Sequence, residues 1–341
     1  YRRQSGVHLG ERRAMDRHFI HFETPEVAKI VNDTAPPPGP EEILIAVDHA
    51  GINRADLLQR LGLYPPPEDA SPIPGLEVAG RVVAVGEHCS TLKMGDRVCA
   101  LTHGGGYASH AIAREDHCLS LPDNLSTEQG AALPEALLTV WYNVMERGQL
   151  SAGETVLIHG GSSGIGSIGI QMAAAFGANV ISTAGSAARC EAVKALGASF
   201  VANHREGSLA EQFNDAGFGE KIDVILDIAG GDLMQANLDL AAPDGRIVCI
   251  GVMRGMQSEI NLATLFMKRL TLTGSTLRRL DTAERARCFS AIRDRIWPRV
   301  ITGDIQPIVD TSYFLADVLE AHEHMRLGTH FGKLVLDCRM G

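Results

Sequence analysis

The chain has 341 residues, of which 45% are hydrophobic and 21% charged, and its formal net charge is −10. This length exceeds what one hydrophobic core usually serves, so we expect two domains. The negative charge disfavours nucleic-acid and membrane surfaces as partners, and no apolar run approaches the ~20 residues of a membrane span. The seven cysteines include no C-x-x-C pair, which predicts free thiols in a reducing, cytoplasmic location.

Residues 1–14 contain four arginines and no apolar pattern. We expect this leader to lie outside the fold, either disordered or not native, with Met15 as the natural start. A basic targeting peptide is the alternative.

From residue 15 to residue 134, strand-like runs are separated by glycine and proline without intervening helices. This pattern is typical of an antiparallel, partly barrel-like domain. A capping box from Ser126 to Gln129 predicts a helix start, and a second helix is expected over residues 135–148.

A glycine-rich turn follows the apolar run 156–158 and precedes a helical pattern that stops at Gly177. Glycines let the backbone approach a ligand, and the unpaired N–H groups of a helix N-terminus favour a pyrophosphate. The spacing departs from the strict G-x-G-x-x-G, so an ordinary βα turn is the alternative. The residues expected to bind the cofactor here are Gly161, Ser162, Ser163, Gly164, Ile165 and Gly166.

The segments after this turn alternate between short apolar runs and helical patterns, which predicts a doubly wound parallel sheet covered on both faces. The helices are expected near residues 187–196, 207–216 and 232–241, and the strands near 180–183, 200–202, 224–226 and 247–250. Beyond residue 274 we expect helices at about 281–301 and 315–327 and a last strand at 333–336. The strand within residues 269–276 should form a sheet edge, which favours a homodimer. Charged groups outside that strand would instead keep the chain monomeric.

The choice of nicotinamide cofactor depends on the residues about 20 positions beyond the turn. An NAD-specific site carries an acid there, but residues 183–189 contain none. Ser186 and Arg189 would instead bind a 2′-phosphate, which predicts NADPH. The alternative for Arg189 is an exposed charge on a helix.

A series of short motifs gives the chain a family resemblance. They are Gly-Ile-Asn-Arg-Ala-Asp at 51–56, Gly-Leu-Tyr-Pro-Pro-Pro at 62–67, Pro-Gly-Leu-Glu-Val-Ala-Gly at 74–80, Gly-Asp-Arg-Val at 95–98, Leu-Pro-Glu-Ala at 133–136, the glycine-rich turn, and Gly-Lys at 332–333. In their order the chain resembles the zinc-free, zeta-crystallin-like quinone oxidoreductase branch of the medium-chain dehydrogenase/reductase superfamily.

The resemblance implies an α/β protein with two domains. A GroES-like antiparallel catalytic domain would comprise residues 15–136 and 278–341, and a Rossmann domain with a doubly wound parallel sheet would comprise residues 137–277. Zinc alcohol dehydrogenases carry metal ligands at or near the positions of Asn53, Leu76 and Glu135. In this chain the three residues at those positions are non-ligands or poor ligands, so no metal site is expected. Without a Lewis acid, alcohol oxidation is disfavoured, and reduction of activated acceptors by NADPH is implied.

The resemblance places three candidate catalytic residues around the acceptor: Asn53, Tyr64 and Asp56. Asn53 would donate a hydrogen bond to the acceptor oxygen, and Tyr64 would stack on the acceptor or donate a proton. The alternatives are a packed loop aromatic for Tyr64 and a residue that fixes the local backbone for Asp56.

The resemblance also implies further cofactor contacts. Gly185, Arg189 and His204 match the residues that hold the 2′-phosphate, with His204 replacing a tyrosine, and Arg326 is a further candidate. Gly251, Phe331, Lys333 and Thr139 would surround the nicotinamide and its ribose. Asp227 either shapes the ribose side or makes a structural loop contact.

The implied function is metal-independent, NADPH-dependent reduction of a small-molecule quinone or related activated carbonyl. Reduction of enones or enoyl thioesters is one alternative. A weakly catalytic nucleotide-binding protein is the other.

Overall fold

The computed structural model describes residues 15–339, so the expected leader at residues 1–14 lies outside the described residues. One domain is built on a six-stranded sheet, in which every neighbouring pair of strands is parallel. Its strands are β8 (Thr155–Ile158), β9 (Asn179–Ala184), β10 (Phe200–Asn203), β11 (Ile222–Asp227), β12 (Ala241–Cys249) and β13 (Thr271–Gly274). The spatial order β10-β9-β8-β11-β12-β13 is that of a doubly wound Rossmann sheet.

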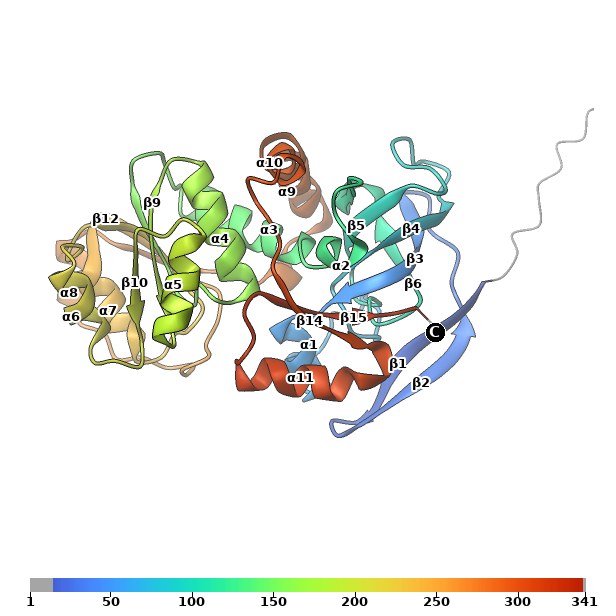
Figure 1. The fold of residues 1–341 in the computed structure, drawn as a ribbon, viewed down its shortest axis with the longest axis horizontal. Helices are drawn as coiled ribbons and strands as arrows, with labels where there is room; N and C mark the ends of the chain where they lie inside the picture. Colours follow the sequence, from blue (N-terminus) through green and yellow to red (C-terminus); the bar gives the residue numbers. More distant parts are fainter. Residues whose placement is uncertain (1–14, 340–341) are drawn as a thin grey trace, which may run out of the picture.

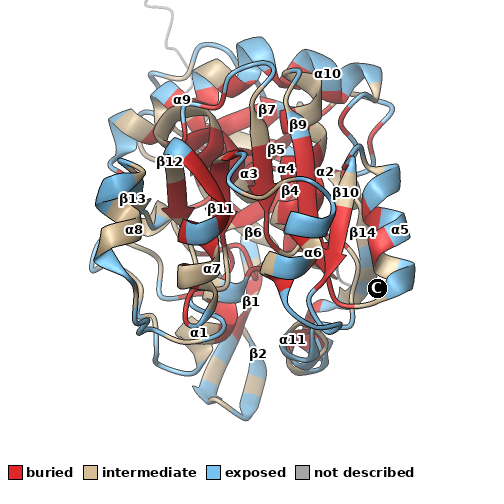
Figure 2. Cartoon of the chain, turned by 90° about the vertical axis from the view of Figure 1, so that its left-hand side faces the viewer, coloured by how far each residue is buried: buried red, intermediate tan, exposed pale blue. Residues whose placement is uncertain are grey.

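Helices cover both faces of this sheet, because successive residues of each strand point to opposite faces. Val156 and Ile158 of β8 belong to one core cluster, together with Ile168, whereas Leu157 belongs to another, together with Phe213. Figure 2 shows β9 and β11 as buried strands, whereas α6 has exposed residues on its outer side. The covering helices are α4 (Gly164–Ala175), α5 (Ala187–Ala195), α6 (Leu209–Asp215), α7 (Leu233–Leu240) and α8 (Leu262–Met267). The predicted α/β alternation is confirmed.

The second domain contains a seven-stranded sheet to which both ends of the described chain contribute (Figure 1). Its strands are β3 (Glu42–Gly51), β4 (Glu77–Val85), β5 (Arg97–Leu101), β6 (His110–Arg114), β7 (Cys118–Ser120), β14 (Val309–Phe314) and β15 (Lys333–Asp337). All pairs are antiparallel except β14 with β15, and the hairpin of β1 (Asp16–Thr24) and β2 (Val27–Thr34) lies beside the sheet. The antiparallel GroES-like architecture is confirmed, whereas the predicted domain limits remain a prediction.

Two predicted helices differ from those observed. The helix expected at 135–148 is α3 (Pro134–Val140) followed by a π-helix, η2 (Trp141–Arg147). The helix expected at 281–301 is divided into α9 (Thr282–Arg295) and α10 (Trp297–Thr302). The break precedes Pro298, which lacks an N–H donor and whose ring clashes with the preceding turn. The remaining short elements are α1 (Arg54–Arg60), α2 (Thr127–Gly130), α11 (Val318–Leu327), η1 (Glu115–His117), η3 (Leu277–Arg279) and η4 (Leu315–Asp317).

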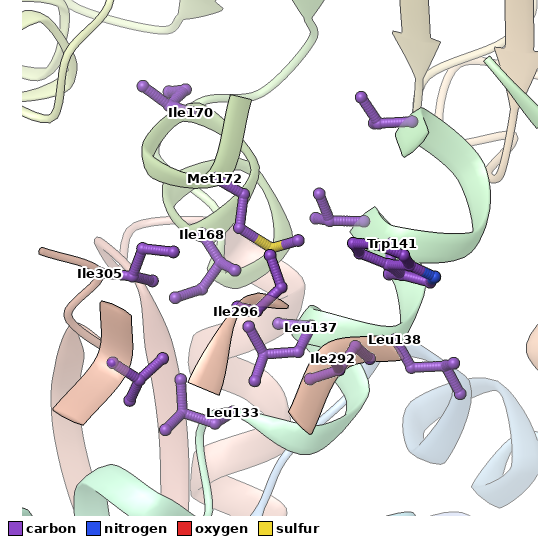
Figure 3. Packing of buried hydrophobic residues seen from close by; sticks show 14 of the residues in the cluster. Leu133, Leu137, Leu138, Trp141, Ile168, Ile170, Met172, Ile292, Ile296 and Ile305 are labelled. Atoms are coloured by element: carbon purple, nitrogen blue, oxygen red, sulfur yellow. The ribbon is translucent and has the colours of Figure 1, made fainter. Parts of the chain in front are cut away.

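The two domains share one hydrophobic core. Figure 3 shows Leu137 of α3, Ile168 of α4 and Ile292 of α9 meeting at this joint, and each is at most 1% exposed. Burial of one such side chain contributes ~1.5–3 kcal/mol, so several of them hold the domains firmly together. Within the described residues, no helix is long and apolar enough to cross a membrane.

Candidate functional site

The glycine-rich turn joins β8 to α4 and leaves backbone donors at the helix start. Gly160 adopts a φ of 69°, and a Cβ on Gly166 would lie 2.2 Å from the Gly160 carbonyl oxygen. The Ser163 hydroxyl caps α4 by accepting from the Gly166 N–H at 2.9 Å. The N–H groups of Gly164 and Ile165 have no acceptor within residues 15–339. Two unpaired donors at the positive end of a helix fit a pyrophosphate.

The C-terminal segment packs directly on this turn. The Gly332 N–H donates to the Ser162 carbonyl at 2.8 Å. The Lys333 side chain then passes Gly164 so closely that a Cβ there would lie 2.3 Å from Lys333 Cδ. The turn predicted to bind the pyrophosphate is therefore in direct contact with Lys333, which is predicted to lie near the nicotinamide.

The ammonium of Lys333 ends in a buried polar cluster. It donates to Asn53 Oδ1 at 2.6 Å and to Glu77 Oε1 at 2.5 Å, while Asn53 Nδ2 donates to Glu77 Oε1 at 2.9 Å. Lys333, Glu77 and Asn53 are 5%, 0% and 6% exposed. The second oxygen of Glu77 accepts from the Glu135 N–H at 2.9 Å. Each charge is thus paired and hydrogen-bonded, which offsets the cost of its burial.

This cluster determines which hydrogen bonds the Asn53 side chain can still donate to a substrate that accepts the hydride. Its carbonyl oxygen and one amide hydrogen are engaged by Lys333 and Glu77, so one N–H remains for the predicted hydrogen bond. The ammonium of Lys333 already neutralises Glu77 at this place. Within the described residues, no group of three or more His, Cys, Asp or Glu side chains could hold a metal ion.

Glu77 and Glu135 are site residues that the sequence reasoning missed. Within residues 15–339, the buried atoms Glu135 Oε2 and Thr139 Oγ1 have no hydrogen-bond partner, and the two residues lie one helical turn apart on α3. Burial raises the pKa of Glu135 to about 7, and the nearby Lys333 opposes that shift. A glutamate that follows Pro-Gly-Leu and begins an apolar strand was the available signal for Glu77.

Asp56 is fully buried. Its carboxylate accepts from the Asn53 N–H at 2.8 Å, from the Gly75 N–H at 3.2 Å and from the Tyr107 hydroxyl at 3.1 Å. Burial raises its pKa to about 6, and these hydrogen bonds oppose the shift. A carboxylate so enclosed favours the alternative in which Asp56 fixes the local backbone, and its assignment to catalysis stays a prediction.

Tyr64 lies at the edge of the site on the loop after α1. The guanidinium carbon of Arg278 lies 4.3 Å from the Tyr64 ring centroid, and its Nη1 donates to the Tyr64 carbonyl at 2.7 Å. One face of the ring is therefore covered, and only the other can stack on an acceptor. Within residues 15–339 the hydroxyl has no hydrogen-bond partner, so it can still donate.

The residues predicted for the 2′-phosphate gather at the end of β9. A Cβ on Gly185 would lie 3.0 Å from His204 Nε2, and the Ser186 hydroxyl accepts from the Arg189 N–H at 3.3 Å. The Arg189 guanidinium donates to the carbonyls of Gly328 at 2.9 Å and His330 at 3.2 Å. Arg189 thus binds the C-terminal segment rather than extending freely into solvent.

Two other candidates, Arg326 and Asp227, make contacts within the protein. Arg326 pairs with Glu323 at 2.5 Å on the exposed side of α11. Asp227 accepts from the N–H groups of Ala229 and Gly230 at 2.7 and 2.9 Å, so its contact is structural.

Gly251 and Phe331 flank the expected nicotinamide region. A Cβ on Gly251 would lie 2.4 Å from the Ile228 carbonyl oxygen, so only glycine fits where β11 and β12 end. The Phe331 N–H donates to Asp310 Oδ1 at 2.8 Å, which fixes the segment that leads into β15.

Comparison with known proteins agrees with this geometry. Residues 39–123 match the alcohol dehydrogenase GroES-like domain, and residues 164–292 match a family described as zinc-binding dehydrogenase. A quinone oxidoreductase from Sus scrofa is 35% identical over 92% of this chain and 95% of that protein. The structure of Escherichia coli quinone oxidoreductase complexed with NADPH is 30% identical, with a TM-score of 0.81 over 95% of this chain and 100% of that one.

A third similar structure is the CurK enoyl reductase, which is 25% identical, with a TM-score of 0.81 over 94% of this chain and 99% of that one. The relatives thus include proteins named for two kinds of reduction. The chain belongs to the medium-chain dehydrogenase/reductase superfamily, among the quinone oxidoreductases, and is an oxidoreductase with a nicotinamide cofactor.

Proposed function

We propose that this protein uses NADPH to reduce quinones or related activated carbonyls without a metal ion. The observation that carries the proposal is that Lys333 contacts both the glycine-rich turn and Asn53. Its stem packs on the pyrophosphate turn at Gly164, and its ammonium ends beside Asn53. A hydride donor held by the turn would therefore lie beside the polar cluster of Lys333, Asn53 and Glu77.

The residues present fit the cofactor. The unpaired N–H groups of Gly164 and Ile165 would hold the pyrophosphate, and Ser186, Arg189 and His204 would hold the 2′-phosphate. The buried, unpartnered hydroxyl of Thr139 is available to the nicotinamide. NADPH, when bound, supplies the hydride.

The protein's own residues supply orientation and charge. The remaining N–H of Asn53 would donate to the acceptor oxygen, where negative charge develops. The Lys333 ammonium orients the Asn53 amide. It also neutralises the Glu77 carboxylate, so that no uncompensated negative charge lies beside Asn53. The Tyr64 hydroxyl would donate a proton to the reduced acceptor, which water can also do.

The test is NADPH consumption by the purified protein with ortho- and para-quinones, enones and an enoyl-CoA. We expect quinones to be reduced with the highest kcat/KM. If NADPH binds and no acceptor is reduced, the protein is a nucleotide-binding protein with little turnover, and the proposal fails. Stoichiometric zinc in the active protein, measured by atomic emission, would contradict the metal-free reading.

Cofactor choice needs its own comparison. We expect NADH to be the poorer donor, and Arg189→Ala to lower the preference for NADPH over NADH at least tenfold through KM. Lys194→Ala is the matched control, because Lys194 lies on the same helix as Arg189 and pairs at the surface with Glu191. Equal efficiency of NADH and NADPH in the unmodified protein would defeat the assignment.

We also propose a cytoplasmic homodimer. All seven cysteines are free, as suits a reducing compartment. The edge strand β13 has a neighbour on one side only, and exposed apolar side chains of Phe266, Met267 and Leu272 accompany it. Pairing with a second copy would cover this edge.

A further inference from the structure

A cavity lies on the GroES-like domain beside the loop that carries Tyr64. Its volume is about 610 Å³, and its walls come from the loop at residues 67–71, the segment after β5 and the first turn of α9. None of the residues assigned above to NADPH or to the acceptor lines it. This volume lies within the range of small-molecule sites.

The inner wall of this cavity contains a buried arginine without a carboxylate partner. Arg285 is 7% exposed, and its Nη2 donates to the carbonyls of Leu277 at 3.3 Å and Arg278 at 3.2 Å. Its Nε is buried and has no hydrogen-bond partner. Burial lowers its pKa, and the Coulombic attraction of Asp69 and Asp281 opposes that shift. An unneutralised buried cation is costly, so an anion bound here would stabilise it.

A second guanidinium lines the same cavity. Arg278 donates to the carbonyls of Tyr64 at 2.7 Å and Pro65 at 3.2 Å and to Gln59 Oε1 at 2.5 Å. Among residues 15–339, no carboxylate forms an ion pair with either Arg278 or Arg285. Both guanidinium groups line this cavity, Arg285 buried and Arg278 partly buried, and guanidinium groups are typical partners of a carboxylate, sulfonate or phosphate.

His103 adds a neutral donor to this wall. Its Nδ1 lies 3.3 Å from Arg285 Nη1. Because a guanidinium can only donate, Nδ1 is the acceptor, and the ring hydrogen is on Nε2. Nε2 lies 3.2 Å from Asp69 Oδ1, and a hydrogen bond there lowers the pKa of Asp69.

The carboxylates of the cavity are already engaged or exposed. Asp281 caps α9 by accepting from the Glu284 N–H at 2.7 Å, and Glu42 accepts from the Gly39 N–H at 2.8 Å. The Asp69 side chain is 83% exposed, so it lies at the rim. The far wall holds Arg17 and Arg114, each of which pairs with acidic residues. The unpaired charge is therefore concentrated at Arg278 and Arg285.

We propose that this cavity binds a small organic anion through Arg285 and Arg278, with His103 as a further donor. Because Arg278 also holds the main chain of Tyr64, a bound anion would fix the loop at the edge of the acceptor site. The anionic group would belong either to the acceptor itself or to a separate effector. Only this link to the acceptor rests on the proposed function; the binding does not.

The deciding experiment measures binding of naphthalene-1-sulfonate, which cannot be reduced by NADPH, by isothermal titration calorimetry on the full chain. We expect one binding event, at least tenfold weaker in Arg285→Met and restored in part by Arg285→Lys. Arg295→Met is the matched control, because Arg295 is exposed on the same helix and lies over Trp141. Arg278→Met provides a second variant if Arg285→Met does not fold.

Unchanged affinity in both Arg285→Met and Arg278→Met, or no binding by the unmodified protein, overturns the proposal. A second pair of measurements identifies the source of the anion. Preference for 1,2-naphthoquinone-4-sulfonate over 1,2-naphthoquinone, lost in Arg285→Met, indicates an anionic acceptor. A change in neutral quinone reduction on adding naphthalene-1-sulfonate indicates a separate effector. Failure to reduce either quinone would defeat the proposed function and leave the calorimetric result to decide the cavity.

Discussion

Lys333 is the residue on which the interior of the site depends. Its ammonium is the cation that forms an ion pair with fully buried Glu77, and it also orients Asn53. Removing one partner of a buried pair leaves an uncompensated charge, whereas removing both charges costs less. The pair is therefore open to a double-mutant test.

We expect Lys333→Met to lower the free energy of unfolding by ~3–5 kcal/mol. The double variant Lys333→Met/Glu77→Gln should be more stable than Lys333→Met alone, because the stranded carboxylate is gone. Urea unfolding followed by circular dichroism measures both, with the exposed Lys194→Met as the control. Additive losses in the double variant would contradict the assigned pairing.

A buried hydrogen-bonded group formed by Asp56, Tyr107 and His322 makes the free energy of unfolding depend on pH. The Tyr107 hydroxyl donates to Asp56 and lies 3.1 Å from His322 Nε2. Burial lowers the pKa of His322 from 6.5 to about 3. Between these pH values the imidazole of His322 binds a proton in the unfolded chain but not in the folded chain. The contribution of His322 to the free energy of unfolding is therefore complete above pH 6.5 and is lost as the pH falls.

We expect His322→Gln to flatten the fall in unfolding free energy between pH 6.5 and 4 by at most ~1.4 kcal/mol per pH unit. Asp56, whose pKa is raised from 3.8 to about 6, acts in the opposite direction, because its contribution is lost as the pH rises. The comparison is therefore between variant and unmodified protein at each pH. His88→Gln, at an exposed position, serves as the control, and an unchanged slope in His322→Gln would refute the role of this buried group.

At the scale of elements, the start of α4 joins stability to cofactor binding. The Ser163 hydroxyl caps this helix, as Ser208 caps α6. Ser163→Ala should cost ~1 kcal/mol of unfolding free energy and also weaken NADPH binding, because the cap holds the turn that faces the pyrophosphate. Ser208→Ala should cost a similar amount without changing NADPH affinity. Calorimetric titration of both variants decides the matter, and equal NADPH affinities would sink the expectation.

The elements also show what the sequence could predict. The alternation of strands and helices and the glycine-rich turn follow from local patterns, because apolar runs and helix starts are encoded by neighbours in sequence. The π-helix at residues 141–147 and the Lys333–Asn53–Glu77 cluster are not local. They depend on packing between residues far apart in the chain, and a lone lysine or glutamate in an apolar strand does not reveal its partner. The enclosure of Asp56 was missed because it depends on Tyr107 and Gly75.

At the scale of the whole molecule, the open sheet edge at β13 leads us to expect that two copies of the chain pair as a homodimer. We expect Leu272→Glu, at a position 40% exposed, to convert the homodimer to a monomer by placing like charges across the paired edges. Light scattering after gel filtration measures the mass, with Ile301→Glu on α10 as the control at another exposed apolar position. A monomeric unmodified protein would rule out the proposed dimer.

The C-terminal strand has a consequence for synthesis in the cell. Gly332 is hydrogen-bonded to the glycine-rich turn, and Lys333 completes the buried polar cluster with Asn53 and Glu77. While residues 332–337 are still inside the ribosomal exit tunnel, neither region is complete, although the parallel sheet has already emerged. Nucleotide capture should therefore begin only after this strand has left the exit tunnel, because both regions need residues 332–337 to be complete.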